Sequence, residues 1–244
     1  MPIQRSTVKL ERIHTDICGP LLDKDIYRFR YFITFIDEAM RYTWTYPLVE
    51  KADAFNVFLA FQAQVEQQSG LKIKGVYADN GGEYISNRFR AYLRDNGMIL
   101  YISQAYSPEM NGIQERLNRT LVEKTSAMLW TAKLPVSFWS LGLGAATYVK
   151  NRSPTTVLSV TPYEAWHGEP LNLGHLRIFG CHALQAHVPE ELRLKTQWHA
   201  RMTDCVFIGY YETENLYKLW DIDGSKKVCK LKKRSFTRVI TTRI

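Results

Sequence analysis

The alternation of short β-type runs with longer helical segments restricts the folds open to this chain more than any other feature. Apolar and polar residues alternate over 10–17, and β-branched and aromatic residues form two runs, 30–37 and 42–48, joined by a polar turn. A helical period follows from Asp53 until Gly70, and a short apolar run occupies 73–78. A strand, a hairpin, a helix, a strand and further helices predict an α/β fold, a mixed sheet flanked by helices.

The second half of the chain changes from helical to strand-like periodicity. Residues 88–96 predict a helix and 99–102 a strand, and Ser107-Pro108-Glu109 supplies an N-cap, a proline and an acid for a helix from 108 to about 131. Further helices are predicted over 135–150 and from Thr161. Beyond His175, a small β-barrel is predicted from four short runs: 178–183, 205–210, 217–221 and 227–231. The predicted domains are 1–170 and 171–244.

Composition limits the class of protein and its partners. The 244 residues are 45% hydrophobic and 23% charged, which is typical of a folded chain with one large domain and a small appendage. A net charge of +8 favours a polyanion such as DNA, although a charge of this size also keeps ordinary proteins soluble. The four cysteines form no C-x-x-C pair, and no run of 18 apolar residues exists. We therefore expect a soluble intracellular protein with neither membrane nor small-molecule cofactor.

Three acidic residues carry the candidate chemistry. Asp16 and Asp79 each leave the end of a predicted strand, and sites in such sheets gather beyond the carboxyl ends of the strands. Glu115 lies in the early turns of the helix predicted from 108. A carboxylate cluster of this kind suits Mg²⁺, which prefers hard oxygen ligands. Spacing alone says little, because the chain has 24 acids and most acids are solvated surface charges.

Several motifs around these acids resemble one known family. They are His14-Thr15-Asp16 with Gly19-Pro20, Asp79-Asn80-Gly81-Gly82-Glu83-Tyr84, Ser107-Pro108 with Asn111-Gly112, Glu115-Arg116 with Asn118-Arg119-Thr120-Leu121, Asn151-Arg152-Ser153-Pro154, and His175-Leu176-Arg177-Ile178-Phe179-Gly180-Cys181. Together they resemble the integrase of copia-type LTR retrotransposons over essentially the whole chain. Between Asp79 and Glu115 lie 35 residues, as in the D,D-35-E pattern of retroviral and retrotransposon integrases.

The resemblance implies a fold, a reaction and partners. The fold is a ribonuclease H-like core with a mixed five-stranded sheet, followed by a small SH3-like β-barrel. Asp16, Asp79 and Glu115 are the implied catalytic residues and metal ligands, holding two Mg²⁺ or Mn²⁺ ions that serve a phosphodiester displacement. The implied activity is joining of a donor DNA 3′-hydroxyl to target DNA, by a homo-oligomer that acts in the nucleus.

Some features depart from the family and keep rival interpretations open. Leu100 stands near a position where the family has a histidine, and Ala105 near one where it has a proline. The zinc-binding amino-terminal module of the family is not found before Asp16. One rival is therefore a domesticated or truncated DNA-binding protein without independent catalysis. Another is a nuclease or transposase on the same fold, which would share the metal site.

Other residues are candidates for DNA contact. Asn111, Asn118 and Arg119 share the Glu115 face of the predicted helix, which is otherwise an ordinary solvated face. A basic carboxyl-terminal segment, including Lys230, Lys232, Lys233 and Arg234, would neutralise DNA phosphates, unless it is only a lysine-decorated strand edge.

Two further groups of residues favour ordinary structural roles. The spacing of Cys181, His182, His187, His199 and Cys205 fits no standard zinc finger. The aromatic side chains of Trp130, Phe138, Trp139 and Trp166 are expected to pack in the core or between domains, because they fall in helical segments of mixed apolar content.

Overall fold

The computed structural model describes residues 5–102, 108–186, 202–211, 216–222 and 228–232, and it divides into two compact units. The first unit comprises Met1–Lys124 and Val149–Leu171, and the second comprises Thr125–Tyr148 and Asn172–Ile244. Each unit has its own sheet and is described separately. The predicted domain boundary at residue 170 remains a prediction.

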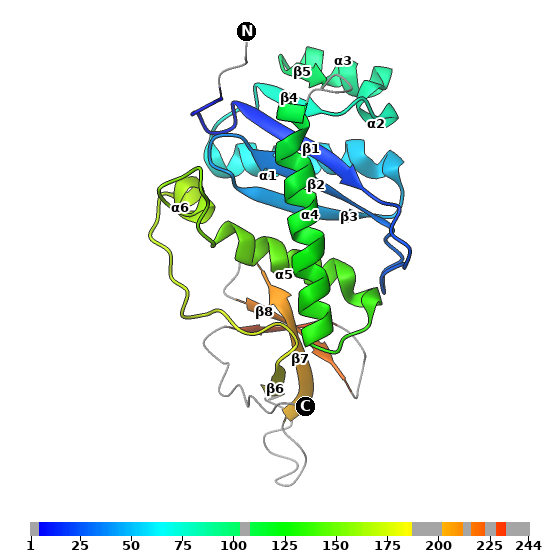
Figure 1. The fold of residues 1–244 in the computed structure, drawn as a ribbon, viewed down its shortest axis with the longest axis vertical. Helices are drawn as coiled ribbons and strands as arrows, with labels where there is room; N and C mark the ends of the chain where they lie inside the picture. Colours follow the sequence, from blue (N-terminus) through cyan, green and yellow to red (C-terminus); the bar gives the residue numbers. More distant parts are fainter. Residues whose placement is uncertain (1–4, 103–107, 187–201, 212–215, 223–227, 233–244) are drawn as a thin grey trace, which may run out of the picture. The chain divides into compact units, whose positions relative to one another are not determined.

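The first unit is built on a mixed five-stranded sheet with the order β3-β2-β1-β4-β5 (Figure 1). Its strands are β1 Arg12–Cys18, β2 Tyr31–Asp37, β3 Thr43–Leu48, β4 Gly75–Ala78 and β5 Ile99–Ile102. β1 and β2 are antiparallel, as are β2 and β3, whereas β1, β4 and β5 run parallel. This is the predicted mixed sheet, with the hairpin at one edge and the parallel strands at the other.

Helices cover both faces of this sheet. The helices of the first unit are α1 Ala54–Ser69, α2 Gly82–Ile85, α3 Asn87–Asp95, α6 Pro162–His167 and most of α4 Pro108–Thr131, with the 3-10 turn η1 Lys51–Asp53 before α1. Figure 1 shows α4 across one face and α1 behind the other. α1 buries Phe58, Phe61 and Val65 in the main core, and it ends where Gly70 adopts the left-handed conformation that favours glycine.

The second unit contains a four-stranded antiparallel sheet with the order β6-β7-β8-β9. Its strands are β6 His182–Ala186, β7 Met202–Tyr210, β8 Leu216–Asp221 and β9 Val228–Lys232. The unit also holds the 3-10 turn η2 Val136–Phe138 and most of α5 Trp139–Asn151. Tyr148 of α5 stacks on Tyr210 with ring centroids 4.0 Å apart, next to the fully buried Phe207 and Tyr217. A small apolar core therefore supports this sheet.

Two sequence predictions about this fold were wrong. The predicted strand over 178–183 begins only at His182, because Gly180 adopts a φ of +81° that interrupts an extended strand. Trp130 was expected to be packed, but it is 87% exposed near the end of α4, whereas Phe138, Trp139 and Trp166 are buried as predicted. In the part of the chain that the structure describes, no helix has the length and apolar character needed to cross a bilayer.

Candidate active site

Two parallel strands, β1 and β4, place Asp16 and Asp79 at the same end of the first sheet, where the carboxyl ends of these strands lie. In the register between β1 and β4, His14 lies opposite Tyr77. Asp16 follows His14 by two residues and Asp79 follows Tyr77 by two residues. Parallel strands advance by the same rise per residue, so the two aspartates reach a common level just beyond the end of β4. The expectation that strand-end acids converge thus has a direct basis in the sheet register.

The Asp16 carboxylate is held by contacts from two directions. The backbone N–H of Ile17 donates to its Oδ1 at 2.8 Å, and Nδ2 of Asn118 donates to its Oδ2 at 2.7 Å. The Asn118 Oδ1 in turn accepts from the hydroxyl of Thr34 at 3.1 Å, on the strand beside β1. Asn118 is only 8% exposed. The carboxylate therefore has a fixed orientation before any ligand arrives.

Asp79 is oriented by the turn that follows β4. Its Oδ1 accepts a hydrogen bond from the backbone N–H of Gly81 at 3.0 Å, which closes a tight turn before α2. A Cβ at position 81 would lie 2.9 Å from Asp79 Oδ1 and 3.0 Å from the Glu83 side chain. A side chain at position 81 would therefore displace the Asp79 carboxylate or the Glu83 side chain from its present position.

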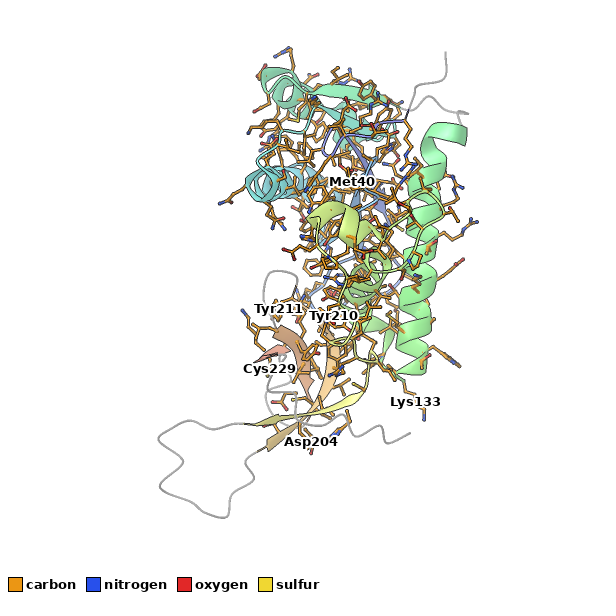
Figure 2. The ribbon with its side chains drawn as sticks, turned by 90° about the vertical axis from the view of Figure 1, so that its left-hand side faces the viewer. Met40, Lys133, Asp204, Tyr210, Tyr211 and Cys229 are labelled. Atoms are coloured by element: carbon orange, nitrogen blue, oxygen red, sulfur yellow. The ribbon has the colours of Figure 1, made fainter. Side chains whose placement is uncertain are left out.

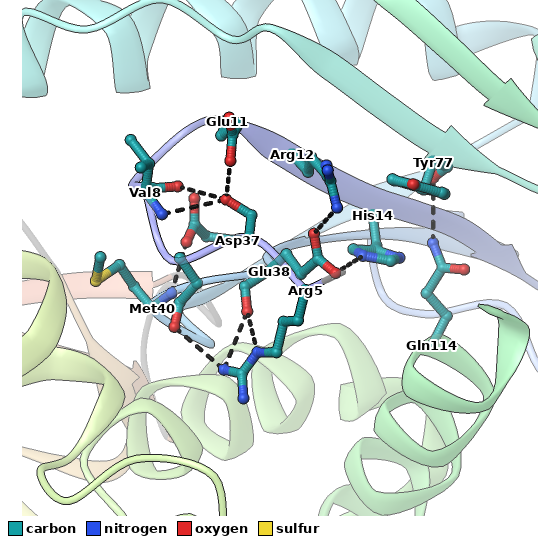
Figure 3. Close-up of polar contacts among 12 residues, drawn as sticks. Arg5, Val8, Glu11, Arg12, His14, Asp37, Glu38, Met40, Tyr77 and Gln114 are labelled. Atoms are coloured by element: carbon teal, nitrogen blue, oxygen red, sulfur yellow. Dashed lines mark hydrogen bonds and ion pairs between the residues drawn. The ribbon is translucent and has the colours of Figure 1, made fainter. Parts of the chain in front are cut away.

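Glu115 comes from α4, which is anchored to the sheet by its neighbour Gln114. The Gln114 side chain is buried, and its Nε2 donates to the backbone oxygen of Thr15 at 2.5 Å and to that of Tyr77 at 3.4 Å. Figure 3 shows Gln114 reaching from α4 to Tyr77. These two carbonyls belong to β1 and β4, the strands that carry the aspartates. Glu115 itself is exposed, so it faces away from the packed side of the helix.

Sequence reasoning missed both anchoring residues of this arrangement. Gln114 was not singled out, and Tyr84 was noted only as part of a motif, although the Tyr84 hydroxyl lies 3.0 Å from the Thr15 hydroxyl in a buried contact. The available signal was a polar residue next to Glu115 and another at the end of the Asp79 motif. The sequence could not show which residues Gln114 and Tyr84 contact, because both contacts join segments far apart along the chain.

The three acids interact electrostatically. Burial is the largest cause that raises the pKa of Asp16, to about 6, and the charges of Asp79 and Glu115 raise it further. The hydrogen bonds from Ile17 and Asn118 act in the opposite direction. Asp16 therefore experiences a surplus of negative charge that a bound cation would neutralise.

The carboxylates of Asp16, Asp79 and Glu115 do not form a closed set of metal ligands in the structure. Among the residues that the structure describes, no three histidine, cysteine, aspartate or glutamate side chains are grouped so that they could hold a metal ion. The donor set itself, three carboxylates near one sheet edge, is of the type that hard divalent cations prefer.

The residues predicted to contact DNA have different environments. Arg119 is exposed on α4, whereas the buried Asn118 is already used by Asp16 and Thr34. Asn111 lies in α4 and Lys232 in β9, but their side chains are outside the described residues, as are Lys233 and Arg234 entirely. These DNA contacts remain predictions.

Lys230 belongs to a small basic and aromatic group in the second unit. Its Nζ lies 5.0 Å from the ring centroid of Tyr211, and the Nζ of Lys218 lies 4.9 Å from the same centroid. Figure 2 shows Tyr211 in the second unit. Lys230 is exposed on β9. For the zinc alternative, the described His182 is engaged with Asp204 at 2.7 Å, while His187 and His199 lie outside the described residues.

The family model and the similar proteins found by comparison all point to the same family. Residues 7–108 match the integrase core domain family. The Pol polyprotein from transposon TNT 1-94 of Nicotiana tabacum is 42% identical over 213 residues, which cover 87% of this chain and 16% of the polyprotein. That from transposon RE2 of Arabidopsis thaliana is 34% identical over 226 residues, with coverages of 89% and 15%. The Ty1-LR3 Gag-Pol polyprotein of Saccharomyces cerevisiae is 29% identical over 181 residues, with coverages of 72% and 10%. The chain thus spans less than a fifth of these relatives.

A solved structure supports the fold. A chain of the simian T-cell lymphotropic virus intasome, in complex with the PP2A regulatory subunit B56 gamma, aligns with a TM-score of 0.56 and 14% identity, covering 99% of this chain and 82% of the matched chain. Together with the core-domain match, this defines a ribonuclease H-like integrase core domain and confirms the predicted fold. The polyprotein relatives narrow the class further: the chain belongs to the copia-type retrotransposon integrase family.

Proposed function

We propose that this chain integrates DNA by joining a retrotransposon DNA 3′-hydroxyl to a phosphodiester of target DNA, with Asp16, Asp79 and Glu115 as catalytic residues and metal ligands. The observation that carries this proposal is the convergence of the first two acids at one end of β1 and β4, with Glu115 close enough to raise the Asp16 pKa. The family membership of the chain agrees with this reaction class.

The residues of the chain would orient the reactants and the ligands. Asn118 and the Ile17 N–H hold the two oxygens of Asp16, the Gly81 N–H holds Asp79, and Gln114 fixes the helix that carries Glu115. When bound, two divalent ions, Mg²⁺ or Mn²⁺, supply activation of the attacking oxygen and stabilisation of the leaving oxygen in an in-line displacement. Preorganised carboxylates avoid the cost of rearranging the site during the reaction.

The remaining parts of the proposal concern DNA and assembly. Arg119 with Asn111 beside Glu115 would contact the donor DNA, and Lys230, Lys232, Lys233 and Arg234 would neutralise phosphates. Residues 171–244 would form the SH3-like domain that follows a core over 1–170. The protein would act as a homo-oligomer in the nucleus, where the target DNA lies.

The experiment that tests this function is strand transfer of a labelled donor-end oligonucleotide into plasmid by the 244-residue chain. We expect joined products with Mg²⁺ or Mn²⁺ and none with EDTA. Cleavage without joining would favour a nuclease on the same fold. DNA binding without either product would favour the domesticated binding protein and contradict catalysis by this chain.

Replacing Asn118 tests the positioning of Asp16. Asn118→Ala removes the 2.7 Å hydrogen bond to Asp16 Oδ2 and one of the two acceptors of the Thr34 hydroxyl, which also lies 3.3 Å from the Asp16 backbone oxygen. Groups that orient metal ligands typically contribute about 10–100-fold to activity or metal affinity, so we expect a loss of that size and a higher Mg²⁺ concentration for half-maximal strand transfer. An unchanged Mg²⁺ dependence would contradict the positioning role, whatever happens to stability.

A further inference from the structure

A second polar site lies on the first unit, in a pocket between α4, the β2–β3 turn and the segment after α5. It encloses about 350 Å³, near the lower end of the range for small-ligand sites, about 300–1,000 Å³. Six polar residues line it together with apolar side chains: Arg41, Arg116, Thr120, Lys150, Thr155 and Thr156. None of the described lining residues is acidic. The pocket therefore gathers three cationic side chains and three hydroxyls without a lining carboxylate.

The cations are held close together at an electrostatic cost. Burial lowers the pKa of Arg41 to about 10, and the charges of Arg5 and Arg116 add to this effect. Burial also lowers the pKa of Lys150 to about 7, with Arg41 and Lys124 as further causes. Repulsion and desolvation raise the free energy of like charges that lie close together in a partly buried pocket, and a bound anion would lower that free energy.

The acids near Arg41 are engaged outside the pocket. Glu38 and Asp37 act on Arg41 electrostatically. The Glu38 carboxylate lies 3.5 Å from Arg12 and 3.9 Å from His14, while Asp37 accepts the backbone N–H groups of Leu10 and Met40 (Figure 3). Neither acid lines the pocket. Their charges therefore compensate Arg41 only in part.

Two buried polar atoms of the pocket residues have no hydrogen-bond partner among the residues that the structure describes. They are Arg41 Nε and Thr155 Oγ1. Buried polar groups almost always have partners, and those that lack one need an explanation. Lys150 Nζ, by contrast, donates to the Arg41 backbone oxygen and to the Thr43 hydroxyl at 2.6 Å each, which fixes its ammonium at the pocket. A bound ligand would therefore supply partners for Arg41 Nε and Thr155 Oγ1.

We propose that this pocket binds a phosphate-type oxyanion, with Arg41, Arg116 and Lys150 supplying the charge and Thr155 a hydroxyl donor. Guanidinium groups and hydroxyls match the geometry of phosphate oxygens. The oxyanion is either a phosphate of the DNA backbone or free phosphate. Arg116 directly follows Glu115 in α4, so a DNA strand at the acidic edge could place a neighbouring phosphate here. Only the assignment to DNA rests on the proposed function.

The first test uses inorganic phosphate as the probe, at constant ionic strength, with titration calorimetry and thermal unfolding of the full chain. Arg116→Gln is the main variant, because its side chain is exposed and its hydrogen bond within the described residues goes to the Gly112 carbonyl of its own helix. Arg90→Gln, an exposed arginine on α3 away from the pocket, is the matched control. We expect phosphate to stabilise the wild type and the control, and to bind Arg116→Gln about tenfold more weakly or worse.

A second variant, Thr155→Val, keeps the proposal testable if Arg116→Gln does not fold. Thr155→Val removes the unpartnered hydroxyl without changing charge, and it is expected to weaken phosphate binding as well. Equal phosphate affinity in the wild type, Arg116→Gln and Thr155→Val would overturn the proposal. These measurements need no catalytic activity, so a chain that binds phosphate but fails to join DNA would refute the proposed function and leave the pocket intact.

The second test assigns the source of the oxyanion by measuring duplex DNA affinity against salt concentration. If a DNA phosphate occupies the pocket, Arg116→Gln should bind DNA more weakly and its log–log salt slope should fall by about 0.9, the value for one lost phosphate contact. If DNA binding is unchanged while phosphate binding is lost, the pocket takes free phosphate. Both results support an oxyanion site and differ only in its occupant.

Discussion

Glu115→Gln is expected to lower the rate of strand transfer by a factor on the order of 10²–10³, the range seen when one electrostatic stabiliser of a transition state is removed. The substitution keeps the size of the side chain but removes one of the three charges that would hold the divalent ions. Stability should change by less than about 0.5 kcal/mol, because Glu115 is exposed and the described structure gives it no hydrogen bond that would be lost. The measurement is single-turnover joining of a labelled donor end, alongside urea unfolding.

Glu123→Gln is the matched control, since Glu123 is also exposed on α4, two turns further along. The same change there should leave joining within about twofold, because its carboxylate is not among the charges that act on Asp16. Equal activity of Glu115→Gln and wild type would remove Glu115 from the site. Equal loss in both variants would point to a general effect of helix charge on DNA binding.

The sequence predicted those elements whose signals are local. The helix from Pro108 to Thr131 has the predicted bounds, because a proline at the first helical position and the apolar period define it without tertiary information. The strand Ile99–Ile102 and the start of α6 beside Thr161 were predicted for the same reason. In the structure, Thr161 and Glu164 form a capping box at that start. Local chemistry was sufficient for the order of elements, and hence for the fold class.

Features that depend on distant partners could not be predicted in this way. Asn118 falls on the polar face of α4 by periodicity, yet it is buried because Asp16 and Thr34 from two strands enclose it. The single helical turn α2 was not predicted, and Tyr84 within it is 2% exposed against the core. Periodicity shows which residues share a face and does not show what that face meets.

The same limit applies to the candidate site. The three acids were chosen from motif order and strand ends. Gln114, which fixes the helix that carries Glu115, was not singled out, and Asn118, which orients Asp16, was interpreted as a DNA contact. A buried glutamine that bonds two strand carbonyls looks, in sequence, like any surface glutamine. The acids are the proposed catalytic residues, and the structure adds the contacts that would hold them in place.

Replacing Asn151 is expected to cause a large loss of stability, because its side chain pairs with the edge strand β3 of the first sheet. β3 is an edge strand, and the outward N–H and C=O of Thr43 bond to the Oδ1 and Nδ2 of Asn151 at 2.9 and 2.7 Å. Thr43 is 1% exposed and Asn151 is fully buried, so water cannot readily replace these bonds. Asn151→Ala should lower the free energy of unfolding by about 2–6 kcal/mol, from two unsatisfied groups at about 1–3 kcal/mol each.

Two further variants separate hydrogen bonding from lost packing. Asn151→Asp has nearly the same shape and keeps an acceptor for the Thr43 N–H, but it sets a carboxylate oxygen against the Thr43 carbonyl, so it should also destabilise the protein strongly. Asn96→Ala is the control, because Asn96 is exposed and, among the described residues, its side chain bonds the Tyr92 carbonyl of the helix that it caps. It should cost less than about 1 kcal/mol. If urea unfolding gave Asn151→Asp the stability of the wild type, the bond from Nδ2 to Thr43 would contribute little. The edge of β3 would then be stabilised mainly by Lys150, which donates to the Arg41 carbonyl and the Thr43 hydroxyl at the same corner.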